Sequence, residues 1–235
     1  MSQRPTQRGP HPRDAQDLGP KAWPKLREAA VDLGWLLGRG YKESSALRVV
    51  GDKFQLSKRQ RDALIRSACS GEQQRQRAAK QVRALEGRAV HVDAFNVLIC
   101  VERALGGGPL LLGCDGAYRD LGGVHGSWRS VDHTLQAITL VGQVLAPARS
   151  VHWWIDRPVS NSGKLAGLLR QVSEERDWLW QVSLEDQVDP VLLAQGGVSA
   201  SADSWILDEC QAWTDLLGPV LAGLAHPWVV DFTQP

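Results

Sequence analysis

The chain has 235 residues, of which 43% are hydrophobic and 23% are charged, and its formal net charge is only +1. These values are typical of a soluble globular protein with one large domain or two small ones, and no apolar run is long enough (about 18 residues) to span a membrane. The four cysteines lack Cys-x-x-Cys spacing, so we expect neither a zinc site nor a disulfide framework, and a reducing cytoplasm is the predicted compartment.

The small net charge hides two halves of opposite sign. Residues 1–90 contain 19 Lys and Arg against 9 Asp and Glu, whereas residues 91–235 contain 8 against 17. A basic half suits a polyanion, and an acidic half with converging carboxylates suits a divalent cation, so the pattern hints at metal-dependent work on nucleic acid. The alternative is two ordinary solvated surfaces that attract each other.

Residues 1–20 contain four prolines among Arg and Gln and no apolar core, which predicts a disordered tail and not a secretory signal. Residues 21–86 are expected to form a small helical unit. Its predicted helices begin at Pro24, Glu43, the capping residue Ser57 and Glu72, and the last of them runs to Leu85. Their basic residues could follow a phosphate backbone, although basic helices are also common on ordinary surfaces. These residues are Lys53, Lys58, Arg59, Arg61, Arg66, Arg75, Arg77, Lys80 and Arg83.

From Arg88 onward, predicted strands alternate with predicted helices, which indicates an α/β domain over residues 87–235 with a parallel sheet covered by helices on both faces. The predicted strands are Ala89–Asp93, Leu110–Cys114, Val151–Asp156, Trp178–Ser183, Gly197–Ala200 and Trp228–Val230. The predicted helices are Phe95–Leu105, Val131–Leu145, Ser162–Arg176, Pro190–Ala194, Asp203–Leu217 and Val220–Leu224. Most tryptophans, Trp205 among them, fall inside apolar elements and are expected to pack in the core or on a sheet face, in preference to forming stacking platforms.

The stretch from Arg88 to Asp93 is a β-branched strand whose final carboxylate directly precedes an apolar helix. Asp93 and Asn96 therefore lie at a predicted strand-to-helix crossover. In open α/β sheets, ligands bind at the carboxyl ends of the strands, and a helix N-terminus there favours anions such as phosphate. The alternative is that Asp93 only caps its helix, a contribution of about 1 kcal/mol.

Two further predicted strands end in acidic residues, one at Asp156 and the other at Ser201-Ala202-Asp203. If the strands are parallel, their carboxyl ends share one edge and bring Asp93, Asp156 and Asp203 together. Clustered carboxylates raise one another's pKa unless a cation neutralises them, so the trio predicts a Mg²⁺ or Mn²⁺ site. Metal-assisted hydrolysis of a phosphodiester is the corresponding reaction, although each Asp could also be a structural cap or turn residue.

Two loops could contact the phosphates of a substrate. A glycine-rich loop carries His125 and Arg129, and glycine allows a phosphate to approach closely enough for an arginine to bind it through two hydrogen bonds. A second loop places Ser160, Asn161 and Lys164 at a helix start directly after Asp156. It is not a Walker loop, because Gly-x-x-x-x-Gly-Lys-Ser/Thr is absent. A plain glycine turn and a simple N-cap are the alternatives.

Two stretches of the chain resemble motifs of known nucleases. Val-Asp93-Ala-Phe-Asn96-Val-Leu resembles the first motif of PIN-like and NYN-type ribonuclease domains, and Ser201-Ala-Asp203-Ser-Trp-Ile resembles their later Ser/Thr-x-Asp-x-x-Ile motif. Over residues 25–232 the chain is similar to domain-of-unknown-function family 434, whose members join a helical N-terminal region to a PIN-like domain. The stretches that carry this likeness are 35–41, 50–56, 114–116, 123–127 and 156–163. The resemblance implies that the Asp residues hold a divalent metal, that Asn96 and Ser201 support the site, and that RNA is cleaved.

The chain departs from the PIN pattern in one respect. PIN nucleases usually carry a second acidic residue in the helix after the second strand, whereas this region offers Asp115, Asp120 and Asp132. Asp115 and Asp208 are the candidate supporting acids, although five residues rotate a helix by about 500°, so Asp208 does not share the helix face of Asp203 well.

Three functions are therefore open. The first is a Mg²⁺- or Mn²⁺-dependent ribonuclease to which the basic helices deliver RNA. The second is a non-catalytic RNA-binding or adaptor protein with an incomplete set of acids. The third is a small-nucleotide phosphohydrolase, for which we expect a deep pocket instead of an open groove.

Overall fold

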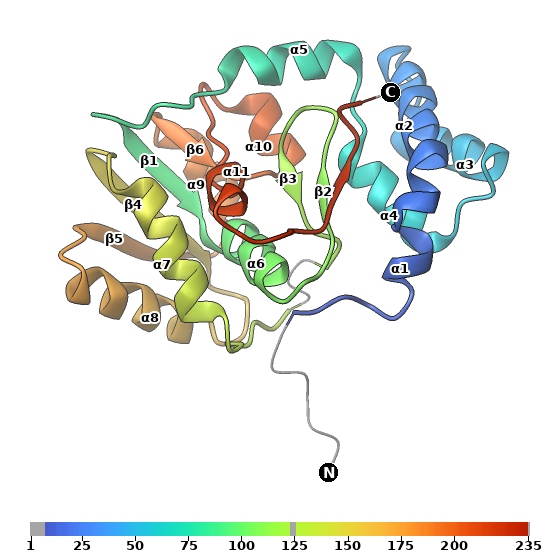
Figure 1. Ribbon diagram of the computed structural model, residues 1–235. Helices are drawn as coiled ribbons and strands as arrows, with labels where there is room; N and C mark the ends of the chain where they lie inside the picture. Colours follow the sequence, from blue (N-terminus) through green and yellow to red (C-terminus); the bar gives the residue numbers. More distant parts are fainter. Residues whose placement is uncertain (1–7, 123–125, 235) are drawn as a thin grey trace.

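A helical part and an α/β part pack side by side (Figure 1). The computed structural model describes residues 8–122 and 126–234. The helical part comprises α1 (Asp14–Asp17), a 3-10 turn η1 (Pro20–Ala22), α2 (Trp23–Gly38), α3 (Glu43–Lys53), α4 (Lys58–Ser67) and α5 (Gly71–Lys80). The strands of the α/β part are β1 (Ala89–Asp93), β2 (Leu110–Leu112), β3 (Tyr118–Arg119), β4 (Ser150–Asp156), β5 (Trp180–Glu185), β6 (Val198–Ala200) and β7 (Val229–Asp231). Its helices are α6 (Ala94–Leu105), α7 (Thr134–Leu145), α8 (Ser162–Glu175), α9 (Val188–Ala194), α10 (Ser204–Glu209) and α11 (Leu217–Ala222).

The main sheet has four parallel strands in the order β5-β4-β1-β6. The predicted α/β class, with a parallel sheet behind a helical N-terminal region, is confirmed. The chain moves outward from β1 to β4 and β5 and then returns to the other side of β1 at β6. The direction of winding therefore reverses between β1 and β6, and ligands of open α/β sheets bind outside the carboxyl ends of the strands at such a switch point.

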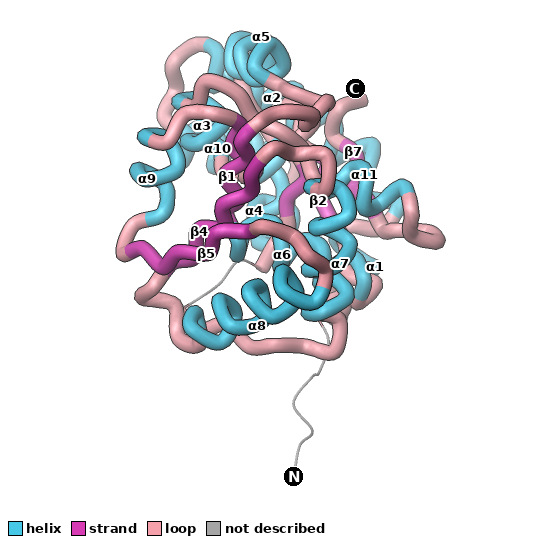
Figure 2. Tube along the Cα trace, turned by 90° about the vertical axis from the view of Figure 1, so that its left-hand side faces the viewer, coloured by secondary structure: helices cyan, strands magenta, loops and turns pink. Residues whose placement is uncertain are grey.

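Helices lie on both faces of this sheet. On one face, Val90, Val92 and Trp153 are buried in a core that α6, α7 and α8 supply. On the other face, Trp154 packs in a separate core with side chains of α9 and α10. Figure 2 shows α6, α7 and α8 grouped on one side of β4 and β5, with α9 on the other.

A second, three-stranded sheet in the order β3-β2-β7 joins the two parts of the chain. Leu111 of β2 and Val230 of β7 are buried in the same core as Leu26, Leu33 and Leu64 of the helical part. The helical part therefore completes its core with strands from the α/β part. Among the described residues, no helix combines the length and the apolar character that crossing a membrane requires.

Two predicted helices are shorter in the structure. The helix expected to run to Leu85 ends at Lys80, and the helix expected over Asp203–Leu217 ends at Glu209. The backbone N–H of Val82 donates to the carbonyl of Trp213 at 2.7 Å, and the N–H of Trp213 donates to Lys80 at 3.1 Å. The residues that follow both helices thus pair with each other in extended form, a long-range interaction that local periodicity does not reveal.

Residues 8–22 are ordered, which corrects the prediction of a disordered tail over residues 1–20. Asp14 and Leu18 are fully buried. The Asp14 carboxylate pairs with Arg59 of α4 and, at 3.2 Å, with Arg103 of α6. Ion pairs therefore hold this segment to both parts of the protein. Its polar composition predicted disorder because composition does not show whether charged residues have buried partners.

The predicted basic surface is smaller than expected, because several of its cations are used internally. Arg77 is only 2% exposed, which corrects its placement on an exposed face. Lys80 donates to the backbone carbonyl of Asp208 at 2.5 Å. Arg59 pairs with the buried Asp14. Lys53, Arg61 and Arg75 also have acidic partners, Asp32, Asp52 and Glu72, in pairs that are at least partly exposed.

The ion pairs of Asp14 yield a stability prediction. Asp14→Ala leaves the guanidinium groups of Arg59 and Arg103 without their buried partner, so we expect the free energy of unfolding to fall by about 3–5 kcal/mol. Asp32→Ala, which removes the partly exposed pair with Lys53, should cost less than about 1 kcal/mol. Urea denaturation measures both values, and equal losses in the two variants would contradict a bridging role for Asp14.

Candidate functional site

Asp93 ends β1 at the switch point, and both of its carboxylate oxygens accept hydrogen bonds. Oδ1 accepts the backbone N–H of Asn96 at 3.2 Å and so caps α6. Oδ2 accepts the hydroxyl of Ser201 at 3.0 Å. Asp93 is only 7% exposed. The N-cap alternative is therefore correct as far as Oδ1 is concerned, while Oδ2 ties the end of β1 to the segment that follows β6.

The segment from Ser201 to Asp203 is fixed from both sides. The backbone N–H of Ala202 donates to Asn96 Oδ1 at 2.8 Å, and its carbonyl accepts Arg119 Nε at 2.8 Å. Ser201 Oγ accepts the backbone N–H of Asp203 at 3.2 Å. The predicted supporting residues Asn96 and Ser201 thus hold this segment beside Asp93. Sequence analysis did not identify Arg119, because an arginine on a two-residue strand carries no local signal.

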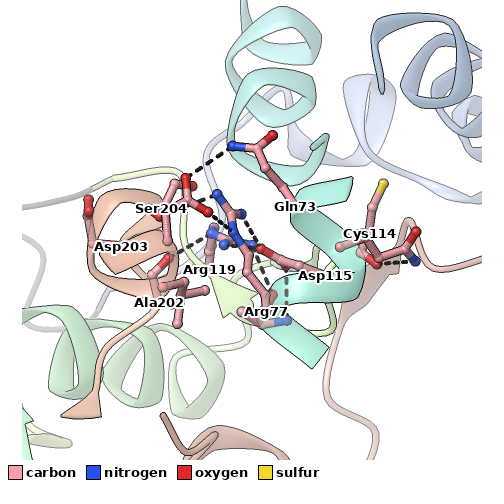
Figure 3. Close-up of polar contacts among 12 residues, drawn as sticks. Gln73, Arg77, Cys114, Asp115, Arg119, Ala202, Asp203 and Ser204 are labelled. Carbon is pink, nitrogen blue, oxygen red and sulfur yellow. Dashed lines mark hydrogen bonds and ion pairs between the residues drawn. The ribbon is translucent and has the colours of Figure 1, made fainter. Parts of the chain in front are cut away.

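Asp203 is exposed and begins α10, where its Oδ1 accepts the backbone N–H of Trp205 at 2.8 Å and that of Ile206 at 3.3 Å. In Figure 3 its side chain points away from the buried ion pairs around Arg119. Trp205 is 47% exposed, which corrects the expectation that it packs in the core.

A fourth acid, Asp189 in the first turn of α9, interacts electrostatically with Asp93, Asp156 and Asp203. Burial raises the pKa of Asp93 to about 7, and the negative charges of Asp156 and Asp189 act in the same direction. Burial also raises the pKa of Asp189, with further contributions from Asp203 and Asp156. We call these four residues the acid cluster. Asp189 was missed because Asp-Pro before an apolar run is an ordinary helix start.

Burial likewise raises the pKa of Asp156, while the backbone N–H of Val188 at the start of α9 opposes this shift. Asp189 is therefore near enough to Asp93, Asp156 and Asp203 for their charges to interact, and Asp156 also acts on Asp93. Within residues 8–122 and 126–234, however, no three or more His, Cys, Asp or Glu side chains are placed to hold a metal ion together. The metal-ligand roles of Asp93, Asp156 and Asp203 stay a prediction.

Asp115 and Asp208, the candidate supporting acids, are engaged by arginines instead. Figure 3 shows Asp115 beside Arg77 and Arg119. The Asp115 carboxylate accepts hydrogen bonds from Arg77 at 2.6 Å and from Arg119 at 2.6 and 2.8 Å. Burial raises its pKa, but the two guanidinium groups outweigh burial and leave the pKa below its usual value. Asp208 accepts hydrogen bonds from Arg77 Nε at 2.7 Å and from Gln73 at 3.0 Å. Both acids neutralise Arg77 and join α5 to the α/β part.

The two predicted phosphate-contacting loops lie against each other. Asn161 has a left-handed backbone, with φ of 69°, and its amide donates to the carbonyl of Trp128 at 2.9 Å. The carbonyl of Ser160 accepts the N–H of Trp128 at 3.0 Å. Arg129 and Lys164 are exposed, whereas His125 lies outside the described residues. Asn161 thus has a structural role, and substrate contacts of this loop pair stay a prediction.

A cavity of about 360 Å³ opens beside the acid cluster, and we call it the recess. Asn96 and Asp203 line it from the α/β part, and Glu43, Ile65 and Arg66 line it from the helical part. The structure thus places one face of the helical part directly beside Asp203.

These features define an α/β protein with acidic side chains at the switch point of its parallel sheet, a recess beside Asp203 and a helical part packed against it. Residues 82–218, more than half of the chain, match the family described as "Domain of unknown function (DUF5616)", so the chain belongs to that family. Residues 25–80 match "Protein of unknown function (DUF434)". The resemblance expected over residues 25–232 therefore holds for the helical part, and the α/β part belongs to a second family.

The chain is also similar to an uncharacterized protein of Methanocaldococcus jannaschii. The two are 32% identical over 149 residues, which cover 62% of this chain and 72% of the relative. No solved structure matches this chain.

The raised pKa of Asp93 predicts a pH dependence of stability. The folded protein retains a proton on Asp93 up to about pH 7, whereas the unfolded chain loses it near the ordinary aspartate pKa of 3.8. Stability therefore falls as pH rises between these values, by about 1.4 kcal/mol for each unit by which the pKa is raised. Asp93→Asn removes the titration. Its amide oxygen can still accept the N–H of Asn96, and its NH₂ group can donate to the Ser201 hydroxyl, which in the wild type donates to Oδ2 of Asp93. In metal-free buffer, the variant should therefore gain stability relative to the wild type as pH rises from about 4 to about 7, and the difference should level off above that. Parallel stability profiles in urea would contradict a buried, raised Asp93.

Proposed function

We propose that this protein is a divalent-metal-dependent hydrolase that cleaves phosphodiester bonds in RNA, with the acid cluster as its centre and a PIN-like α/β domain as its scaffold. The observation that carries the proposal is the buried Asp93 carboxyl, whose pKa burial and two neighbouring acids raise to about 7. Perturbed carboxyl groups in a crevice are typical of functional sites. A helix cap requires one carboxylate, whereas here the charges of Asp156 and Asp189, from two other elements, also raise the pKa of Asp93.

The donor chemistry of the acid cluster fits a hard cation such as Mg²⁺ or Mn²⁺, which prefers carboxylate oxygens. Mg²⁺ often binds through one or two carboxylates and keeps several waters, so it does not require three side chains gathered in advance. Asp93 and Asp203 match the motifs of the resembling nucleases, and Asp156 and Asp189 add negative charge to the same field. When bound, such an ion would orient a water molecule and stabilise the charge that develops on the phosphoryl oxygens.

The surrounding residues hold the acids in place. The Ser201 hydroxyl fixes Oδ2 of Asp93, and the Asn96 amide oxygen fixes the peptide of Ala202 between the two acids Asp93 and Asp203. Side chains locked in this way need little reorganisation when a substrate binds.

RNA is proposed as the substrate on two grounds, which are the nuclease-like motifs and the basic surplus of residues 1–90. The recess favours a second candidate, a small-nucleotide phosphohydrolase, because a cavity of about 360 Å³ lies in the size range of small-molecule sites. The four cysteines are free, which suits the reducing cytoplasm that we propose as the compartment.

Metal binding can be tested without an assay of activity. An ion that binds only the folded protein should raise the melting temperature by about 5–10 °C at roughly 100 times its Kd. We expect Mg²⁺ or Mn²⁺ to produce this shift, EDTA to reverse it, and Asp93→Asn and Asp189→Asn to reduce it. Asp186→Asn, a matched change at an exposed acid, should leave it intact. No shift in the wild type would sink the metal proposal.

Cleavage is tested with end-labelled single-stranded RNA and DNA in the presence of Mn²⁺. Asp93→Asn should abolish RNA cleavage, and Ser201→Ala should slow it by about 10–100-fold, because loss of a group that orients a metal ligand has effects of this size. Asp186→Asn should retain the wild-type rate. Wild-type cleavage in a folded Asp93→Asn variant would refute the catalytic role of the cluster.

A further inference from the structure

The recess is formed jointly by both parts of the chain. Ile65 and Arg66 reach it from α4, while Asn96 comes from the first turn of α6 and Ser204 from the start of α10. Because Asn96 and Asp203 also belong to the candidate site, the recess and the acid cluster are contiguous. A ligand in the recess would therefore touch the helical part and Asp203 of the acid cluster at once.

Arg66 is the cation of the recess that can bind an anion. Its side chain is exposed, and the hydrogen bond described for it is a long one, 3.4 Å, to the backbone carbonyl of Asp120. A guanidinium group has five N–H donors, so most of those of Arg66 remain for a ligand. Arg119 also lines the recess, but it is buried and donates to Asp115 and to the carbonyl of Ala202. The two arginines thus have different roles, Arg119 in the scaffold and Arg66 at the surface of the recess.

Several of the other lining residues suit a sugar and a base, and Asp120 and Asp203 add two carboxylates to the lining. Ile65 and Ala202 offer apolar contact, and Glu43 offers acceptors for hydroxyl or amino groups. The oxygen of the Asn96 amide is occupied by Ala202, so its NH₂ group is the part that can donate to a ligand. A cavity of about 360 Å³ is at the small end of ligand sites, which suits one nucleotide and is too small for a double helix.

We propose that the recess is a subsite for a single unpaired nucleotide unit of the substrate, with its phosphate on Arg66 and its sugar and base between α4 and the start of α10. The inference rests on the proposed function, to which it adds the substrate class. An unpaired nucleotide beside Asp203 places the neighbouring phosphodiester at the acid cluster. The helical part thereby contributes to recognition through one arginine in a shaped cavity.

The test uses the full chain in EDTA, with adenosine and uridine 5′-monophosphates, adenosine, and inorganic phosphate as probes, and isothermal titration calorimetry as the measurement. Both monophosphates should bind, and adenosine and phosphate alone should bind at least about 10-fold more weakly. Arg66→Ala should weaken monophosphate binding by about 10-fold or more, because it removes charge-assisted hydrogen bonds. Arg75→Ala, which removes an exposed arginine of the neighbouring helix, is the matched control and should bind like the wild type.

A second variant fills the recess without changing its charge. Ser204 is exposed and lines the recess, so Ser204→Tyr should block monophosphate binding while the melting temperature stays near that of the wild type. Equal binding of phosphate and monophosphates would show an anion site only and would overturn the proposal. Unchanged binding in folded Arg66→Ala and Ser204→Tyr would overturn it as well.

Failure of this inference is distinguishable from failure of the proposed function. Nucleotide binding that depends on Arg66, without any cleavage of RNA, would leave the recess as a nucleotide site and reject the hydrolase. Metal-dependent cleavage that is insensitive to Arg66→Ala and Ser204→Tyr would retain the hydrolase and reject the recess as its subsite.

Discussion

The buried guanidinium of Arg77 is the interaction on which the rest of the structure depends. It comes from α5 in the helical part and pairs with Asp115 and Asp208 of the α/β part. Asp115 also binds Arg119, whose Nε holds the carbonyl of Ala202 beside Asp203. A charge removed from water is tolerated only when it is paired and hydrogen-bonded, so these partners must keep their places together. The position of the acid-bearing segment after β6 is thereby tied to the helical part.

Asp93 combines two roles that the sequence presented as alternatives. One oxygen caps α6, and the other meets Ser201 at the point where the winding of the sheet reverses. Capping is a reason for an aspartate to stand at a helix start, but it does not account for the approach of Asp156 and Asp189. The capping hydrogen bond fixes the side chain of Asp93, and the neighbouring acids add to the rise of its pKa. A residue held rigidly among like charges is well prepared to accept a cation.

The sequence was sufficient for the elements near Asp93, because alternation, helical spacing and a capping residue all act within a few positions. β1 was predicted with its observed bounds, and the parallel arrangement followed from alternating strands and helices. The predictions that failed concern residues whose partners are distant in the sequence. Arg77 appeared to be a surface cation until Asp115 and Asp208 were placed beside it, and α10 ends early because Trp213 pairs with the residues after α5. Asp189 was missed because its neighbours in the acid cluster come from other elements.

The shared core has a consequence for how the protein is made. Leu26 and Leu33 of α2 share a core with Val230 and Phe232, about 200 residues later in the chain. Asp14 likewise forms its ion pair with Arg103 only after α6 has been synthesised. Because synthesis proceeds from the N-terminus, α2 leaves the ribosome long before β7, the strand that covers its apolar face. Contacts between segments so distant in sequence slow folding, since a long loop must close before they form. The helical segment is therefore synthesised with an uncovered apolar face, and protection of that face by chaperones would matter most before β7 emerges.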